Sequence, residues 1–131
     1  EARTLLDATQ RALYASIACA RAGNCTGDVA ANMQAVVEAR GYNVIRHHTS
    51  HGVGRSLHED PQILNHGRAG TGPRLRPGMT IALEPMVLSG NPETKLMDDD
   101  WTVAALDGKL TAHFEHTIAI TDGDAEILTR L

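Results

Sequence analysis

Apolar residues recur at helical spacing through the first part of the chain. Between Ala2 and Arg21 they form one stripe, made up of Leu5, Leu6, Leu13, Ile17 and Ala20. A second set, Val29, Met33, Val36 and Val37, follows at positions i, i+4, i+7 and i+8. This spacing places the apolar residues on one face of a helix, so the pattern predicts two amphipathic helices.

The residues that flank the two patterns indicate where the helices begin and end. Thr26 is suited to cap the second helix, and Asp28 falls in its first turn, where the helix dipole favours a negative charge. Gly23 and Gly41 follow the two patterns where a helix is expected to stop. We expect one helix from about Ala2 to Arg21 and another from Thr26 to just before Gly41.

After the helices, the pattern changes to the alternation that is typical of strands. We predict a short strand at Tyr42–Arg46, and then a strand at Met79–Val87 in which Ile81 and Leu83 face one way and Ala82 and Glu84 the other. The segment between them, from Glu59 to Gly78, is rich in proline and glycine, and we expect it to be a long loop.

The last part of the chain also alternates. Asp107-Gly108 is a strong turn signal between Trp101–Leu106 and Leu110–Ile120, which predicts a hairpin, and Ala125–Thr129 follows as a last short strand. The order of two helices followed by mainly antiparallel strands predicts an α+β fold, with the helices packed on the sheet.

Composition narrows the class of protein. The chain has 131 residues, of which 42% are hydrophobic and 21% charged, as in a single globular domain. Its net charge of −4 makes nucleic acid an unexpected partner, and it contains no apolar run of the ~18 residues that would cross a membrane. Two cysteines, Cys19 and Cys25, are too few for a disulfide framework, so we expect reduced thiols and a cytoplasmic location.

Three residues suggest a metal site. Glu84 and Glu115 are each the only acid in their predicted strand, and both lie on its polar face. His51 lies beside Gly52 and Gly54 in the segment 50–61. Each carboxylate alone could equally point to solvent, and a histidine beside glycines is more often a surface residue. Together, one imidazole and two carboxylates suit a divalent transition metal with open positions for water and substrate.

These motifs resemble those of methionine aminopeptidases of the bacterial type I class. The resemblance is carried by Ser-His-Gly-Val-Gly-Arg-Ser-Leu-His-Glu-Asp-Pro-Gln at 50–62, by Arg-Pro-Gly-Met-Thr-Ile-Ala-Leu-Glu-Pro-Met at 76–86, by Trp-Thr-Val at 101–103 and by His-Phe-Glu-His-Thr at 113–117. It implies a pita-bread fold, with residues 1–131 as the C-terminal part of the metallopeptidase catalytic domain. The chain begins with glutamate, and the resemblance implies that the N-terminal half of that domain is absent from it.

The resemblance also implies roles for individual residues. His51, Glu84 and Glu115 would bind divalent metal ions, two in the complete site, drawn from Co, Mn, Fe and Zn. Glu84 would also handle the proton of the attacking water. His58 would hydrogen-bond the substrate and steady the tetrahedral intermediate. The side chains of Leu57 and Trp101 would line the pocket for the substrate's methionine.

Members of that family have five protein ligands in the site, two of them aspartates in the preceding half. The chain therefore carries three of the five, and alone it is expected to be inactive. The implied partners are the N-terminal half of the same enzyme, the N-terminal methionine of nascent peptides, and the ribosome. The alternatives are a non-catalytic pita-bread binding module and another aminopeptidase or dipeptidase of the same fold.

Other polar residues near these motifs have simpler interpretations. Asp98, Asp99 and Asp100 are expected to form a solvated turn and not to replace the missing aspartates. His113 shares a face with Glu115 and could support the metal ligands from outside, whereas His116 lies on the opposite face and is expected to be structural.

Overall fold

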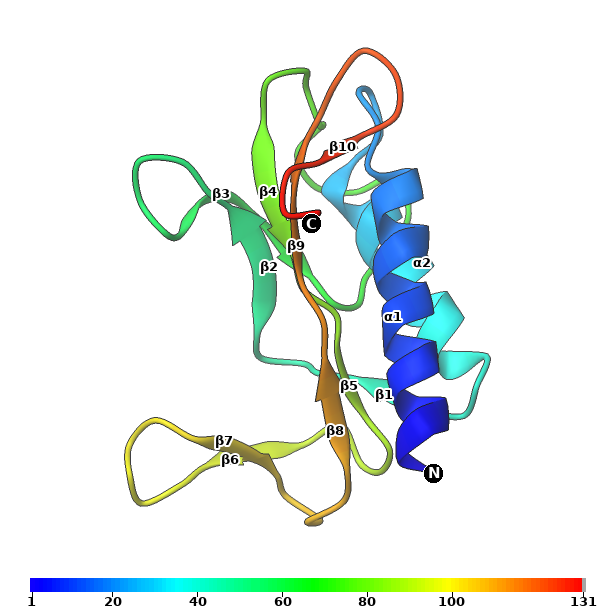
Figure 1. Ribbon diagram of the computed structural model, residues 1–131, viewed down its shortest axis with the longest axis vertical. Coiled ribbons are helices and arrows are strands. Elements are labelled where there is room, and N and C mark those ends of the chain that lie inside the picture. Colours follow the sequence, from blue (N-terminus) through cyan, green and yellow to red (C-terminus); the bar gives the residue numbers. More distant parts are fainter. Residues whose placement is uncertain (131) are drawn as a thin grey trace.

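The computed structural model describes residues 1–130. Two helices, α1 (Ala2–Cys19) and α2 (Thr26–Glu38), lie side by side and cover one side of the sheets (Figure 1). The ten strands of the described chain are β1 (Asn43–Val44), β2 (Thr49–Gly52), β3 (Glu59–Leu64), β4 (Thr80–Leu83), β5 (Met86–Leu88), β6 (Thr94–Leu96), β7 (Val103–Ala105), β8 (Thr111–His113), β9 (His116–Ala119) and β10 (Glu126–Ile127). The expected α+β class is confirmed.

All strand pairs in the described chain are antiparallel. Five strands form the largest sheet in the order β10-β9-β4-β2-β3, three form a second in the order β1-β5-β8, and β6 pairs with β7 alone. The first two sheets are continuous along the chain, because β4 leads directly into β5 and β8 directly into β9. The β6–β7 hairpin projects away from the helices, at the lower left of Figure 1.

The apolar stripes of the helices form the core, with one exception. Leu5, Leu13 and Ile17 are buried, but Leu6 is 46% exposed, so its assignment to the buried stripe was wrong. One buried cluster joins both helices to the five-stranded sheet; it comprises Leu13, Ile17, Ala20, Val29, Ile63, Leu75, Ile81, Leu83, Ile118 and Ile120. A second joins them to the three-stranded sheet; it comprises Leu5, Ala12, Met33, Val37, Val44, Val87 and Ala112. The two helices therefore pack against both sheets and hold the two sheets in place relative to each other.

The start of α2 differs from the prediction in its capping residue. The N-cap is Cys25, and Thr26 is the first helical residue. The Asp28 carboxylate accepts a hydrogen bond from the Cys25 backbone N–H at 2.6 Å, which closes a capping box. It also accepts one from the N–H of Gly70 at 2.7 Å, so this aspartate ties the helix to the loop that follows β3.

Two predicted strands are each broken in two, and one predicted loop contains a strand. Met79–Val87 divides into β4 and β5 because Pro85 has no N–H for the ladder, and Leu110–Ile120 divides into β8 and β9 at Phe114 and Glu115. The expected loop from Glu59 to Gly78 begins with β3, which pairs with β2. Because β3 is an edge strand, it accommodates Pro61.

The hairpin predicted across Asp107-Gly108 is wrong. β7 pairs with β6, and β8 pairs with β5, so the turn connects two different sheets. The Asp107 carboxylate accepts hydrogen bonds from the N–H groups of Lys109 and Asn91, and Gly108 has a φ of +70°. The turn geometry was therefore recognised correctly, but the strands that it joins are not partners.

The remaining predicted strands are shorter than expected. Tyr42–Arg46 contracts to β1, and Ala125–Thr129 contracts to β10. Neither α1 nor α2, the helices of the described chain, is long and apolar enough to span a bilayer.

Candidate metal centre

The two strand breaks lie side by side and bring two carboxylates together. Leu83 pairs with His116 in one sheet and Met86 pairs with His113 in the other. Continuing either register through the break places Glu84 directly opposite Glu115. Like charges in this position repel each other, so the arrangement favours a bound cation between them.

Two polar side chains from elsewhere in the chain hold the break at Glu84. The Ser50 hydroxyl accepts a hydrogen bond from the Glu84 backbone N–H at 2.9 Å, and the Asn65 side-chain oxygen accepts one from Met86 N–H at 3.0 Å. Ser50 and Asn65 are completely buried. They satisfy the two backbone donors that flank Pro85 and so fix where the Glu84 side chain begins. No sequence pattern indicates these two hydrogen bonds, because neither Ser50 nor Asn65 is near Glu84 in the chain.

His51 approaches Glu84 from the neighbouring strand β2. It pairs with Ala82, two residues before Glu84 and on the same face of the sheet. The His51 Nε2 atom lies 3.3 Å from Glu84 Oε1, and both side chains are largely buried. His51 Nδ1 lies 2.8 Å from the carbonyl oxygen of Gly52, which can only accept, so Nδ1 carries the proton. With the proton on Nδ1, the lone pair of His51 Nε2 faces Glu84 Oε1, and a cation between these two atoms could be bound by both.

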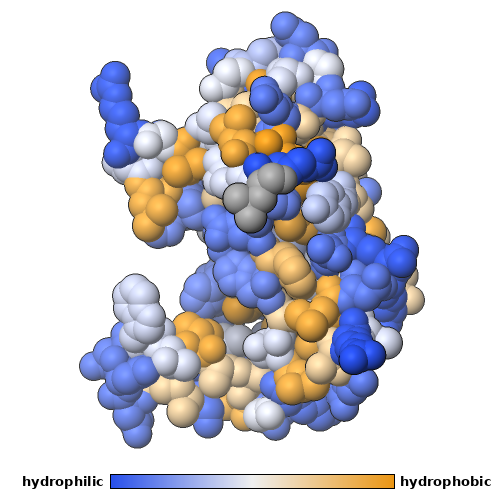
Figure 2. Space-filling view, in the orientation of Figure 1, coloured by the Kyte–Doolittle hydropathy of each residue, from blue (hydrophilic) through white to orange (hydrophobic). Residues whose placement is uncertain are grey.

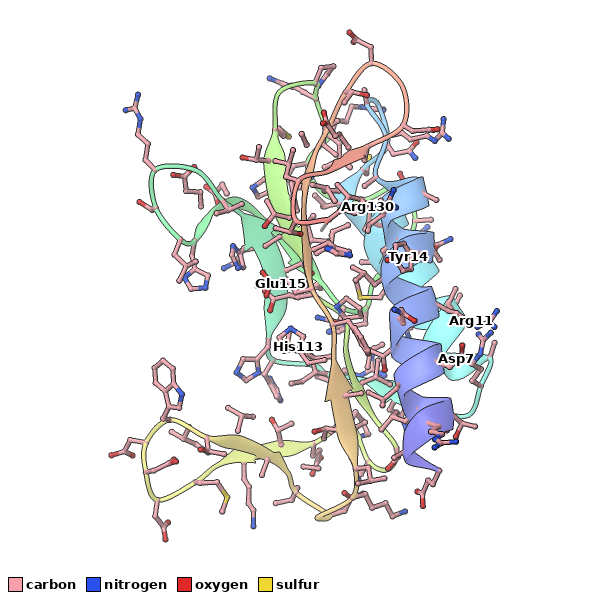
Figure 3. The ribbon with its side chains drawn as sticks, viewed as in Figure 1. Asp7, Arg11, Tyr14, His113, Glu115 and Arg130 are labelled. Atoms are coloured by element: carbon pink, nitrogen blue, oxygen red, sulfur yellow. The ribbon has the colours of Figure 1, made fainter. Side chains whose placement is uncertain are left out.

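His113 approaches the other oxygen of the same carboxylate. Its Nε2 atom lies 3.2 Å from Glu84 Oε2, and its side chain is about half exposed. The hydrogen bond to Glu84 raises the pKa of His113, burial opposes the rise, and the charges of Glu84 and Glu115 add to it. Donor atoms of Glu84, His113 and Glu115 all lie within 4.8 Å of one another. Figure 3 shows the side chains of His113 and Glu115 extending from β8 and its junction with β9 towards the same side of the molecule.

These donors fit a divalent transition metal. Within the described chain, the mostly buried Glu84 carboxylate forms ion pairs with two imidazoles, and the Glu115 carboxylate stands opposite it. Imidazole nitrogen and carboxylate oxygen are the donors that Zn, Fe, Mn and Co accept in proteins. His51 has its tautomer fixed by a backbone carbonyl, as metal-binding histidines commonly do.

The other predicted site residues lie around this centre. His58 is exposed, and its ring centroid is 4.3 Å from that of His51. Leu57, in the loop between β2 and β3, is 72% exposed, and Trp101, in the turn between β6 and β7, is 86% exposed. Their loops form two arms, and the surface between the arms is hollowed (Figure 2). Neither residue lines an enclosed cavity within the described chain, so their assignment to a methionine pocket stays a prediction.

Glycine is required beside His51 because two strands approach closely there. A Cβ on Gly52 would lie 2.2 Å from the backbone oxygen of Asp60 in β3. A Cβ on Gly54 would instead meet the flexible carboxylate of Glu59, at 2.7 Å. The missing side chain of Gly52 therefore makes room for the neighbouring strand.

The residues given simpler interpretations behave as expected. Asp98, Asp99 and Asp100 are exposed in the β6–β7 turn, where the Asp99 carboxylate accepts hydrogen bonds from the backbone N–H of both Trp101 and Thr102. His116 turns away from the site: its Nδ1 atom lies 2.8 Å from the Thr129 hydroxyl, and its ring packs near Tyr14 of α1.

Comparison with known proteins places the chain in a family of metallopeptidases. The model of metallopeptidase family M24 matches residues 1–122, and the chain belongs to that family. Within it, the chain is 46% identical to methionine aminopeptidase 1 of Bacillus subtilis over 129 residues, which are 98% of this chain and 52% of that protein. The crystal structure of methionine aminopeptidase from Thermotoga maritima superposes with a TM-score of 0.97 at 49% identity, again over 98% of this chain and 52% of the other.

More distant members of the family share the fold alone. Prolidase from Pyrococcus furiosus matches 98% of this chain and 32% of its own with a TM-score of 0.74, but at 22% identity. The fold is therefore the expected pita-bread fold of this family. The chain spans about half the length of the curated relatives that it matches.

Proposed function

We propose that this chain is the C-terminal part of an enzyme that removes N-terminal methionine from nascent polypeptides by metal-dependent hydrolysis. The observation that carries the proposal is the pair of opposed carboxylates, Glu84 and Glu115, with His51 Nε2 directed at the first of them. The similarity to methionine aminopeptidases over nearly the whole chain supports the choice of substrate.

His51, Glu84 and Glu115 would hold the metal. Bound there, a divalent ion supplies Lewis-acid chemistry, which polarises a carbonyl group and makes water nucleophilic at neutral pH. Glu84 would take the proton of the attacking water, since its carboxylate is the group around which the other donors gather. His58 would donate a hydrogen bond to the oxygen of the scissile carbonyl, because its ring lies beside that of His51, tilted by 58°, and is exposed.

The side chain of the substrate's methionine would enter the hollow between the two arms. Leu57 on one arm and Trp101 on the other present large apolar surfaces that this chain leaves exposed. A buried thioether gains roughly 1.5–3 kcal/mol from such contacts. The two arms would thus select the first residue of the peptide while the strand breaks hold the reacting bond.

The site would be completed by a second half of the enzyme that precedes this one and contributes two further carboxylate ligands. The relatives are about twice as long as this chain, which supports a second half. The enzyme would act in the cytoplasm, at or near the ribosome, with Co, Mn, Fe or Zn.

The test measures methionine release from a Met-Ala-Ser peptide with added Co or Mn, first with this chain alone and then with the preceding half supplied. We expect release only in the second mixture. Within that mixture, Glu84→Gln should lower kcat by roughly 100-fold or more, the scale of a lost acid–base group. Glu93→Gln, an exposed carboxylate before β6, is the matched control and should leave the rate unchanged.

Two other results of this test would contradict the proposal in different ways. Release by this chain alone would show that its own ligands suffice and that no second half is needed. If the two halves associate but release no methionine, the proposal of an aminopeptidase is wrong, and a non-catalytic binding module or another dipeptidase of the fold takes its place.

A further inference from the structure

His113 is a nitrogen donor that was not predicted from the sequence to be a metal ligand. It ends β8, two residues before Glu115 and on the same face, and its cross-strand partner Met86 is two residues beyond Glu84. The register therefore places its ring against both carboxylates at once. Its donor atom and those of Glu84 and Glu115 lie within 4.8 Å of one another, which is close enough for one ion to contact all three after small side-chain movements.

The two imidazoles lie at different oxygens of Glu84. His51 Nε2 is near Oε1, whereas His113 Nε2 is near Oε2. Among the described residues, the donor atoms that all lie within 4.8 Å of one another are those of Glu84, His113 and Glu115, and His51 is not one of this set. A metal ion on the Oε2 side of Glu84 would thus find a nitrogen and the Glu115 carboxylate beside it, all from this chain.

We propose that His113 is a direct metal ligand, so that Glu84, His113 and Glu115 form a three-donor site for a zinc-like divalent ion within this chain alone. The inference deepens the proposed function and rests on it only in assuming that the Glu84–Glu115 face binds metal. It adds a second nitrogen donor, at the other oxygen of Glu84 from His51, to the ligands proposed above. Because imidazole suits Zn and Fe whereas carboxylate and carbonyl oxygens suit Mn and Mg, His113 would shift the metal preference of the site towards zinc.

A simpler role for His113 is that of a positioning residue, which only donates a hydrogen bond from Nε2 to Glu84. A glutamine at this position separates the two roles. Its amide N–H can donate to a carboxylate as the imidazole does, but it offers a transition metal no nitrogen lone pair. His113→Gln should therefore rescue a positioning role and fail to rescue a ligand role.

The experiment titrates the 131-residue chain with zinc and separately with manganese, for the wild type and for His113→Gln, His113→Ala and His47→Gln. His47 is an exposed histidine before β2 and is the matched control. Loss of a side chain that only supports a metal ligand already weakens binding by roughly 10-fold, so loss of a direct ligand should cost at least as much. We therefore expect both His113 variants to bind zinc at least roughly 10-fold more weakly. Manganese affinity should fall much less, and His47→Gln should match the wild type for both metals.

A second measurement uses the unmodified chain, so it does not depend on how a variant folds. In a ¹H–¹⁵N spectrum of the imidazole rings, one equivalent of zinc should move the Nε2 resonance of His113 and leave its proton on Nδ1. An unmoved His113 ring, or zinc affinity in His113→Gln equal to that of the wild type, would overturn the proposal. Neither readout involves methionine release, so a failure here is distinct from a failure of the proposed function.

Discussion

In the helix-backed sheet the large apolar side chains are buried, whereas in the β6–β7 hairpin they are exposed. Ile81, Leu83 and Ile118 have no measurable exposure, but Leu96 and Trp101 are 57% and 86% exposed. The sheet is covered by α1 and α2, while the hairpin pairs only with itself. A two-stranded hairpin alone is marginally stable at best in water. The helix-backed sheet therefore accounts for most of the stability of this chain, and the hairpin presents exposed apolar side chains that are available to contact substrate.

The candidate metal centre belongs to the helix-backed sheets. Its carboxylates are at breaks in strands that contribute Ile81, Leu83, Val87 and Ile118 to the core. The donors are thus held by the stable region, and the apolar side chains proposed to select the substrate are on the exposed one. Matched substitutions in the two regions should therefore have different effects on stability and on function.

The largest difference is expected for apolar truncation. Leu13→Ala in α1 removes a side chain that is 2% exposed and should lower the free energy of unfolding by about 2–5 kcal/mol, because it leaves a cavity in the main core. Leu96→Ala in β6 should change it by no more than about 0.5 kcal/mol. Urea denaturation followed by circular dichroism measures both. Equal losses would mean that the hairpin is part of the stable unit.

A smaller effect is expected at the support of the strand break. Asn65→Ala leaves the Met86 N–H buried without its acceptor and should cost about 1–3 kcal/mol. The control is Asn91→Ala in the loop before β6, where an exposed side chain accepts a bond from the N–H of Glu93. That change should cost about 0.5 kcal/mol or less. Thermal unfolding of both variants tests the pair, and an Asn65→Ala variant as stable as the control would contradict the role given to Asn65.

Part of this fold could be predicted from the sequence. Both helices were predictable because their apolar periodicity is local, and the burial of Leu13 and Val29 follows from it directly. The hydrogen bonds that hold the break at Glu84 were not predictable, because they come from Ser50 and Asn65 in distant segments. β6 was missed because no pattern of its own marks it, and only its pairing with β7 makes it a strand.

The candidate site was partly predictable for the same reason. Alternation placed Glu84, His113 and Glu115 on polar faces, and the structure brings the three together. The sequence could not reveal that the strands carrying them are neighbours in a register that opposes the two carboxylates. Without that register, the contact between His113 and Glu84 had no basis, and His113 was given only a supporting role.

A third pair of substitutions compares the two regions by the pH dependence of their contribution to stability. Asp28 and Asp99 both have a pKa below the ordinary carboxyl value of 3.8, because each accepts backbone hydrogen bonds; for Asp99, the bond from the Thr102 hydroxyl contributes most. A lowered pKa stabilises the fold fully above pH 3.8, and this stabilisation is lost as the pH falls through the folded-state value. Asp28 connects α2 to a distant loop, whereas Asp99 bonds only within its own turn.

Asp28→Asn should therefore lower the unfolding midpoint at neutral pH by a few degrees, and its difference from the wild type should shrink as the solution is acidified. Asp99→Asn should leave the midpoint almost unchanged at every pH, because opening the hairpin turn does not uncover the core. Thermal melts across an acid pH series measure both. An Asp28→Asn difference that grows on acidification would have the wrong sign for a lowered pKa.

The smallest effect on stability is expected at Trp101, where the effect on function should be large. Because the indole is 86% exposed, Trp101→Ala should leave the unfolding free energy within about 0.5 kcal/mol of the wild type. In the two-half mixture, loss of its apolar surface should raise KM for a methionyl peptide by roughly 10-fold or more, which corresponds to at least ~1.4 kcal/mol of binding. Leu106→Ala, at a position after β7 that is 51% exposed, should alter neither quantity. A Trp101→Ala variant that loses stability without a change in KM would place this side chain in the packing of the chain and remove it from the substrate pocket.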